Sequence, residues 1–144
     1  MYILNVELLD ILRDENEKAE TLALQNNWIL TKSGSVTRVS TVPNKIEFGG
    51  EKFIGSFIYK NDVLRSVFLI PIIEKIEIPN YPCKEYQNIK KEYCLKMLRK
   101  IYGEECRREE NEIEWETPRY IIGIYTITEG KDKYTGGNIR IDMR

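Results

Sequence analysis

Two segments of this sequence repeat the same short pattern, and each follows a stretch with helical periodicity. Ile46-Glu47-Phe48 is followed after four residues by Phe53-Ile54, and Ile113-Glu114-Trp115 is followed after four residues by Tyr120-Ile121. Each copy is typical of two short strands. The order of elements along the chain is helix, strands, helix, strands. This order predicts an α+β fold, in which the helices do not alternate with single strands and a curved, mostly antiparallel sheet forms a layer of its own. A tandem α-β-β-β arrangement would divide the chain into quasi-repeats over residues 5–78 and 80–144.

The two copies differ by one residue in the spacing between the aromatic residue and the glycine that follows it. One residue separates Phe53 from Gly55, whereas two residues separate Tyr120 from Gly123. Side chains alternate between the two faces of a strand, so this difference places the two glycines on opposite faces unless a bulge absorbs it. True repetition and chance similarity between short apolar strands are both retained as interpretations.

Two segments have the apolar period of about 3.6 residues that amphipathic helices show. In residues 6–24 the apolar stripe contains Glu15, so this helix is expected either to bend or fray near that residue or to bury its carboxylate. The second helix follows Pro82 and is expected to end at Gly103. Leu95 and Tyr102 lie opposite its apolar stripe and are candidate partner contacts. We expect both helices to pack on one face of the sheet.

The remaining apolar segments are typical of β-strands. Asn61-Asp62 predicts a tight two-residue hairpin, and Pro71 predicts an edge, a bulge or a strand end because proline cannot donate to the ladder. Ser33-Gly34-Ser35 and residues 129–137 are expected to form turns. The expected strands cover residues 36–42, 45–48, 52–60, 63–70, 72–78, 113–117, 119–128 and 138–143.

Length and composition predict one globular domain, residues 1–144, in which 42% of the residues are hydrophobic and 31% are charged. The net charge of −1, from 22 basic and 23 acidic residues, provides no field that would attract nucleic acid or an anionic membrane. Glu7 and Asp10 interrupt the first apolar run, so no secretory signal is evident and a cytoplasmic location is expected. The longest uncharged apolar run, residues 66–73, is too short to span a bilayer.

The absence of histidine excludes several kinds of site at once. Neither a Ser-His-Asp triad nor a Cys-His pair can form within this chain. Cys83, Cys94 and Cys106 lack the close spacing of a zinc site, and their odd number favours reduced thiols over a disulfide framework. A single Cys83–Cys94 or Cys83–Cys106 bond is left open. No cofactor is expected.

Glu112, Glu114 and Glu116 alternate along a predicted strand, so their carboxylates share one face. A solvated strand face is the favoured interpretation. A row of three acids could alternatively bind a cation and support a metal-dependent hydrolase, which is the main enzymatic hypothesis for this chain.

Nine tyrosines give the chain a large aromatic supply. Tyr59, Tyr120 and Tyr125 fall in or beside predicted strands and could form a recognition surface on an open sheet face. Together with the lack of a catalytic constellation, they favour a non-catalytic protein-binding module of the inhibitor, immunity or adaptor type. A small-ligand site between the sheet and the second helix is a further hypothesis.

Overall fold

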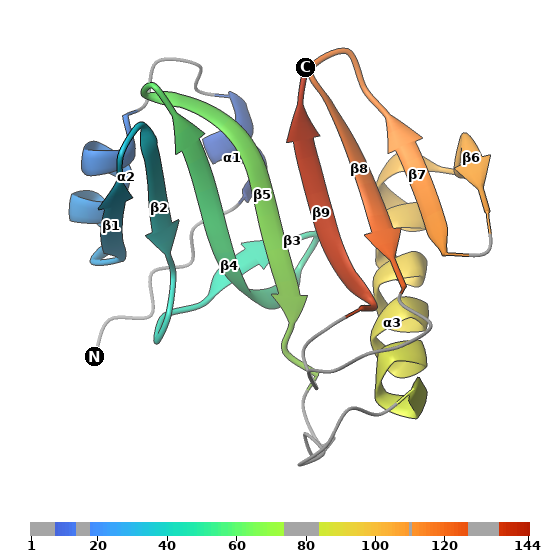
Figure 1. Ribbon diagram of the computed structural model, residues 1–144. Helices are drawn as coiled ribbons and strands as arrows, with labels where there is room; N and C mark the ends of the chain where they lie inside the picture. The colour runs from blue at the N-terminus through green and yellow to red at the C-terminus, as the bar shows by residue number, and fades with distance from the viewer. Residues whose placement is uncertain (1–7, 14–17, 74–83, 110, 127–135) are drawn as a thin grey trace.

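One antiparallel sheet of nine strands dominates the computed structural model, which describes residues 8–13, 18–73, 84–109, 111–126 and 136–144 (Figure 1). Its strand order is β1-β2-β4-β5-β9-β8-β7-β6, and β3 pairs with β4. The end strands β1 and β6 do not pair with each other, so the sheet is open. The strands are β1 (Ile29–Ser33), β2 (Val36–Ser40), β3 (Ile46–Phe48), β4 (Glu51–Lys60), β5 (Val63–Pro71), β6 (Arg107–Arg108), β7 (Glu112–Glu116), β8 (Tyr120–Tyr125) and β9 (Asn138–Met143).

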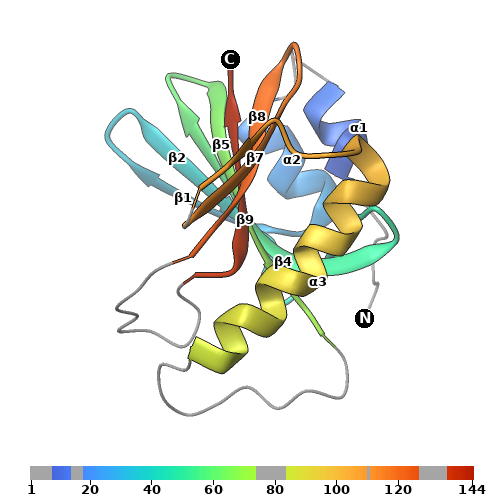
Figure 2. The ribbon, with the colours of Figure 1, turned by 90° about the vertical axis from the view of Figure 1, so that its right-hand side faces the viewer.

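The described helices all lie on one face of this sheet (Figure 2). They are α1 (Leu8–Arg13), α2 (Ala19–Asn26) and α3 (Lys84–Tyr102). Helix α1 contacts β3, α2 contacts β1 and β2, and α3 contacts β8 and β9. The predicted α+β fold, with an antiparallel sheet covered by helices on one face, is therefore confirmed. None of these helices has both the length and the apolar character that crossing a bilayer requires.

The single helix predicted over residues 6–24 is replaced by α1 and α2, and residues 14–17 between them lie outside the described residues. Helix α2 ends at Asn26, after which Asn27 adopts a left-handed conformation with φ of 56°. The amide N–H of Asn27 donates to the carbonyl oxygen of Ala23, and the amide N–H of Trp28 donates to the same oxygen at 2.9 Å. This left-handed residue redirects the chain from the helix into β1.

Two other turn predictions are confirmed. Gly103 has φ of 82° and its N–H donates to Arg99 O at 2.9 Å, which ends α3. Asn61 and Asp62, at φ of 51° and 64°, join β4 to β5 in the doubly left-handed conformation that a two-residue hairpin favours. Pro71 is the last residue of β5, as its missing N–H predicts.

The sequence did not predict the two strands at the ends of the sheet. β1 is exposed along most of its length, and β6 consists of two exposed arginines, so neither carries the apolar alternation by which strands are recognised. Several predictions lie partly or wholly outside the described residues. Ile72 and Ile73 are not in a strand, and the rest of the predicted strand 72–78 lies outside the described residues. The same holds for the predicted helix entry at Pro82, for residues 127–128 of the predicted strand 119–128, and for residues 129–135 of the final turn region.

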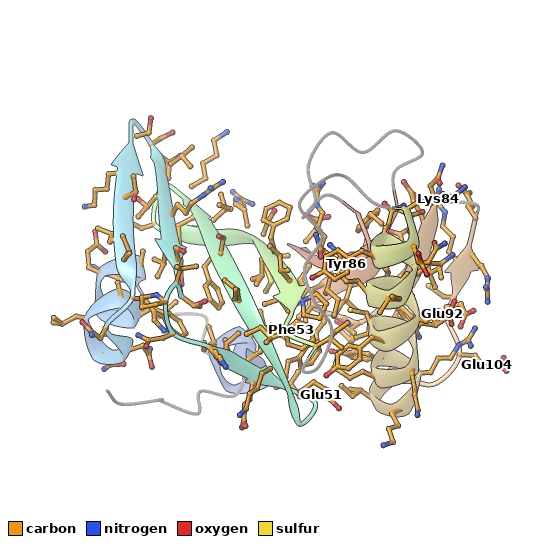
Figure 3. The ribbon with its side chains drawn as sticks, turned by 90° about the horizontal axis from the view of Figure 1, so that it is seen from below. Glu51, Phe53, Lys84, Tyr86, Glu92 and Glu104 are labelled. Carbon is orange, nitrogen blue, oxygen red and sulfur yellow. The ribbon has the colours of Figure 1, made fainter. Side chains whose placement is uncertain are left out.

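The core lies between the sheet and the helices. On β4, the residues facing the helices are Phe53, Phe57 and Tyr59, and all three are buried. Phe57 stacks on Trp28, with ring centroids 5.5 Å apart. Figure 3 shows side chains filling the space between the strands and α3, with Phe53 on the inner side and Tyr86 directed from α3 toward the strands. The alternate positions of β4 face away from the helices.

Apart from α1 and β3, which have no counterpart among the described elements, the two halves of the fold contain the same kinds of element in the same order, although the residue echo does not match in register. Helix α2 precedes β1, β2, β4 and β5, helix α3 precedes β6, β7, β8 and β9, and the halves meet where β5 pairs with β9. Ile46, however, pairs with Phe53, whereas Ile113 pairs with Ile124. The quasi-repeats over residues 5–78 and 80–144 therefore stay a prediction.

Candidate partner-binding surface

The face of the sheet that carries no described helix is here called the open face. A row of residues crosses it from strand to strand, each residue being the direct cross-strand partner of the next. In order from β5 to β6, this central row consists of Phe68, Arg140, Gly123, Glu114 and Arg107. Because directly opposed residues have their Cβ atoms about 5 Å apart, neighbours in the row can interact. The row runs from an apolar half of the open face, which contains Phe68, to a charged half, which contains Glu114 and Arg107.

The apolar half covers β2, β4 and β5. Ile54 and Ile58 of β4 and Ile70 of β5 are half-buried, whereas Phe68 keeps 39% of its surface exposed. Arg38 of β2 lies opposite Ile58, is exposed, and has no ion pair with any other described residue. A cation without a carboxylate partner beside half-exposed apolar side chains is a combination that protein interfaces favour.

Arg140 borders this apolar half, and its position is fixed from two sides. Its guanidinium carbon lies 5.5 Å from the centroid of the Phe68 ring. Its Nε donates to Asp142 Oδ1 at 3.0 Å, and Ser66 Oγ donates to the same oxygen at 3.0 Å. Arg140 therefore presents a planar cation already stacked on an aromatic ring.

The charged half contains the glutamate row of β7. As predicted, Glu112, Glu114 and Glu116 share one face, while Ile113 and Trp115 are buried on the other. The row is bound by arginines: Arg107 lies 3.1 Å from Glu114 and 3.3 Å from Glu112, and Arg144 lies 3.8 Å from Glu116. Among the described residues, no group of three or more acidic or cysteine side chains is arranged to hold a metal ion. The hydrolase hypothesis therefore has no assembled site in this part of the chain.

Tyr125 is the one predicted aromatic contact that lies on the open face. It is half-buried, and its hydroxyl donates to Glu114 Oε2 at 2.8 Å. Burial and this hydrogen bond to a carboxylate both raise the pKa of Tyr125, so the hydroxyl stays protonated and acts as a donor.

The other predicted contacts are Tyr59, Leu95, Tyr102 and Tyr120. The prediction of an exposed contact is wrong for Tyr59, Leu95 and Tyr120, which the rest of the chain covers. Tyr59 and Leu95 are buried at 2% and 4% exposure, and Tyr120 is nearly buried. Tyr59 shares the strand phase of Phe57, which turns it toward the helices. Leu95 is buried because the buried part of the α3 surface is wider than the apolar stripe predicted from the sequence.

Tyr102 and Tyr120 form a pair between α3 and β8. Their hydroxyl oxygens are 2.7 Å apart, and their rings meet edge to face with centroids 6.4 Å apart. Tyr102 is half-buried within this contact. Burial is the main cause that raises the pKa of Tyr102, and the hydrogen bond to Tyr120 adds to it. These tyrosines therefore join a helix to the sheet, which is a structural role.

Phe68 and Arg140 were not among the predicted contacts, although a sequence signal for both existed. Val67 and Leu69 flank Phe68 and are buried, and Ile139 and Ile141 flank Arg140 and are buried. Strict alternation therefore turns Phe68 and Arg140 to the opposite face of each strand. The available signal was an aromatic residue, Phe68, at a strand position whose neighbours on both sides are apolar and whose own side chain points to the opposite face.

The resolved pKa shifts in the described residues all move a group away from neutrality. Those of Glu20 and Glu105 are lowered, and the pKa values of Lys32, Arg99, Arg107 and three other groups are raised. Burial, for example, raises the pKa of the Cys94 thiol to about 12. A general acid or base works best with a pKa near the working pH, and none of these eight described groups is moved toward it.

No protein-family model matches the sequence, and no curated protein or solved structure matches the chain at a significant level. What the protein does must therefore be inferred from its own surface. The described residues offer shallow depressions as well, among them one of about 330 Å³ lined by Leu9, Leu12, Thr117, Pro118, Arg119 and Tyr120. This depression adjoins α1 and not α3, beside which the small-ligand hypothesis placed its site, so that hypothesis stays a prediction.

Proposed function

We propose that this protein is a non-catalytic protein-binding module, of the inhibitor, immunity or adaptor type, which contacts its partner through the open face. The observation that supports this most is the half-exposed apolar cluster of Phe68, Ile54, Ile58 and Ile70 on a face without a described helix. Apolar side chains in such a cluster lose water-exposed area when a second protein covers them.

The chemistry bordering the cluster favours a protein partner. Aromatic residues and arginine dominate the binding energy of protein interfaces, and Phe68 and Arg140 are in contact at the centre of this face. A nucleic acid would meet the carboxylates of Glu112 and Glu114 on the same face, which oppose a phosphate backbone. Arg38, without a carboxylate partner among the described residues, favours an acidic group at the matching position of the partner.

The experiment compares partner recovery by three forms of the protein in lysate of its source organism. Proteins retained by the wild-type chain are identified by mass spectrometry and then purified for calorimetric titration. Phe68→Asp is expected to weaken binding of the true partner by about 2 kcal/mol, or about thirty-fold in Kd, because it places a charge at the centre of the interface. Val42→Ser is the matched control, since Val42 is also exposed but lies outside the strands.

Circular dichroism and the urea midpoint establish that both variants are folded. A partner that binds Phe68→Asp as tightly as it binds Val42→Ser and the wild type contacts another surface, and that result would overturn the proposal. The proposal is also overturned if every retained protein binds Phe68→Asp as tightly as it binds the wild type.

A further inference from the structure

The outer edge of β1 is a second surface with a defined chemistry. β1 pairs only with β2, in a register that places Ser33 opposite Val36. The hydrogen bonds of β2 show which main-chain groups face which neighbour. Ser35 O accepts from Asn61 N at 3.0 Å, and Thr41 N donates to Gly55 O at 3.0 Å. The odd-numbered residues of this segment therefore turn their main chain toward β4, and the even-numbered residues turn theirs toward β1.

This alternation determines the free groups of β1. Its residues opposite the even-numbered residues of β2 are Ile29, Thr31 and Ser33, and these exchange hydrogen bonds with β2. The N–H and C=O groups of Leu30 and Lys32 consequently point away from the sheet. Within the described residues, no main-chain group pairs with them on that side. Two residues with paired outward donors and acceptors are the template that strand addition requires.

A surface pocket of about 290 Å³ lies beside this edge, where α2 runs behind β1 (Figure 1). One side of it is a single stripe of α2 and its cap, because Ala23 and Leu24 are each three or four residues from both Glu20 and Asn27. Leu24 in this stripe is 85% exposed, although it is a large apolar residue on a helix that packs on the core. The pocket is lined by Glu20, Ala23, Leu24, Asn27, Trp28 and Leu30.

Trp28 provides an independent observation at the same place. Its side chain is 6% exposed, and its Nε1 is the buried side-chain polar atom that lacks a hydrogen-bond partner in the described structure. Buried polar groups are nearly always paired, so this indole N–H, on a residue that lines the pocket, is an exception among the described side chains.

We propose that the β1 edge and the adjoining α2 pocket bind an extended segment of a partner polypeptide, which adds as a strand to β1 and places an uncharged apolar side chain in the pocket. The outward groups of Leu30 and Lys32 specify a main chain, because another strand presents alternating donors and acceptors at the same spacing. Lys32 Nζ and Glu20 Oε1 are 2.8 Å apart at this site. Their charges compensate each other, so the pocket selects an apolar side chain and not a charged one.

The test uses a displayed library of random peptides as the probe, selected against the full chain. Selected peptides are expected to protect the amide N–H groups of Leu30 and Lys32 from hydrogen exchange. Lys32→Pro removes one outward N–H and should weaken these peptides by about tenfold. The matched control is Lys32→Ala, which also removes the ion pair with Glu20 but keeps the N–H, and it should bind within about twofold of the wild type.

Leu24→Asp tests the pocket without disturbing the core, since Leu24 is exposed, and it should abolish selection of apolar peptides. The inference is overturned if no peptide is selected, if Lys32→Pro and Lys32→Ala bind equally, or if light scattering shows that the edge instead pairs with a second copy of this chain. Phe68→Asp leaves this edge intact, so failure of the open-face proposal and failure of this one give different results.

Discussion

The hydroxyl of Tyr125 donates to Glu114 Oε2 at 2.8 Å across two strands, and the aromatic ring lies over Gly123. A Cβ atom at Gly123 would stand 3.0 Å from Tyr125 Oη and 3.1 Å from the carbonyl oxygen of Ile113. Gly123 is also the direct partner of Glu114 and of Arg140. The glycine therefore provides the flat position that lets Tyr125 reach diagonally to Glu114 on the open face.

Gly123→Ala is expected to lower the free energy of unfolding by about 1–3 kcal/mol, because the new methyl group is too close to a main-chain oxygen and to the Tyr125 ring. Tyr125→Phe removes only the hydrogen bond and should cost about 1 kcal/mol. Urea denaturation of both single variants and of the double variant measures their coupling. Strictly additive effects would show that the glycine does not position the tyrosine.

The stability of the protein is expected to fall at alkaline pH through Tyr102 and Tyr125. Both phenol pKa values are raised in the folded state, so the folded chain holds these protons more tightly than the unfolded chain does. Their contribution is complete below the unfolded pKa of about 10 and is lost as the pH rises through the folded values. Urea midpoints are measured as the pH is raised from about 8, and the loss of stability should begin near pH 10. Above that pH the midpoint should decline less steeply in Tyr102→Phe than in the wild type.

Lys90 is fully buried in α3 and should be far more sensitive to substitution than a lysine on the exposed side of the same helix. Its Nζ lies 3.0 Å from Asn138 Oδ1 and 4.9 Å from the centroid of the Tyr86 ring. Lys90→Ala takes this donor away from Asn138 Oδ1 and removes buried contacts between α3 and β9, so it is expected to cost about 1–3 kcal/mol. Lys96→Ala, at an exposed position of α3, should change the stability by less than about 0.5 kcal/mol. Thermal and urea unfolding compare the two variants, and equal losses would contradict the buried role of Lys90.

The two described cysteines are free thiols and should differ sharply in reactivity. Burial raises the pKa of Cys94 to about 12, so it supplies almost no thiolate, whereas Cys106 is exposed. Cys83 lies outside the described residues. In Cys83→Ser, a thiol-reactive dye should therefore label Cys106 rapidly in the native protein and label Cys94 only after denaturation. Peptide mapping assigns the labelled site, and rapid native labelling of Cys94 would contradict its burial.

Local patterns in the sequence determined many of the regular elements and which residues share a face within them. The apolar stripe of α3 and Gly103 predicted that helix, Asn61-Asp62 predicted the β4–β5 hairpin, and the alternation of Glu114 with Trp115 predicted the two sides of β7. These features could be predicted because they depend on residues within a few positions of one another, through helical and strand periodicity.

Only the tertiary structure decided which face of each strand meets the helices and which strands become neighbours. Tyr59 and Tyr125 are both strand tyrosines, yet one is in the core and the other on the open face. Phe68 and Arg140 come into contact because β5 pairs with β9, strands far apart in the sequence. Strand pairing depends on long-range packing that local periodicity does not encode, so the residues that meet on the open face and the free edge of β1 could be recognised only in the folded chain.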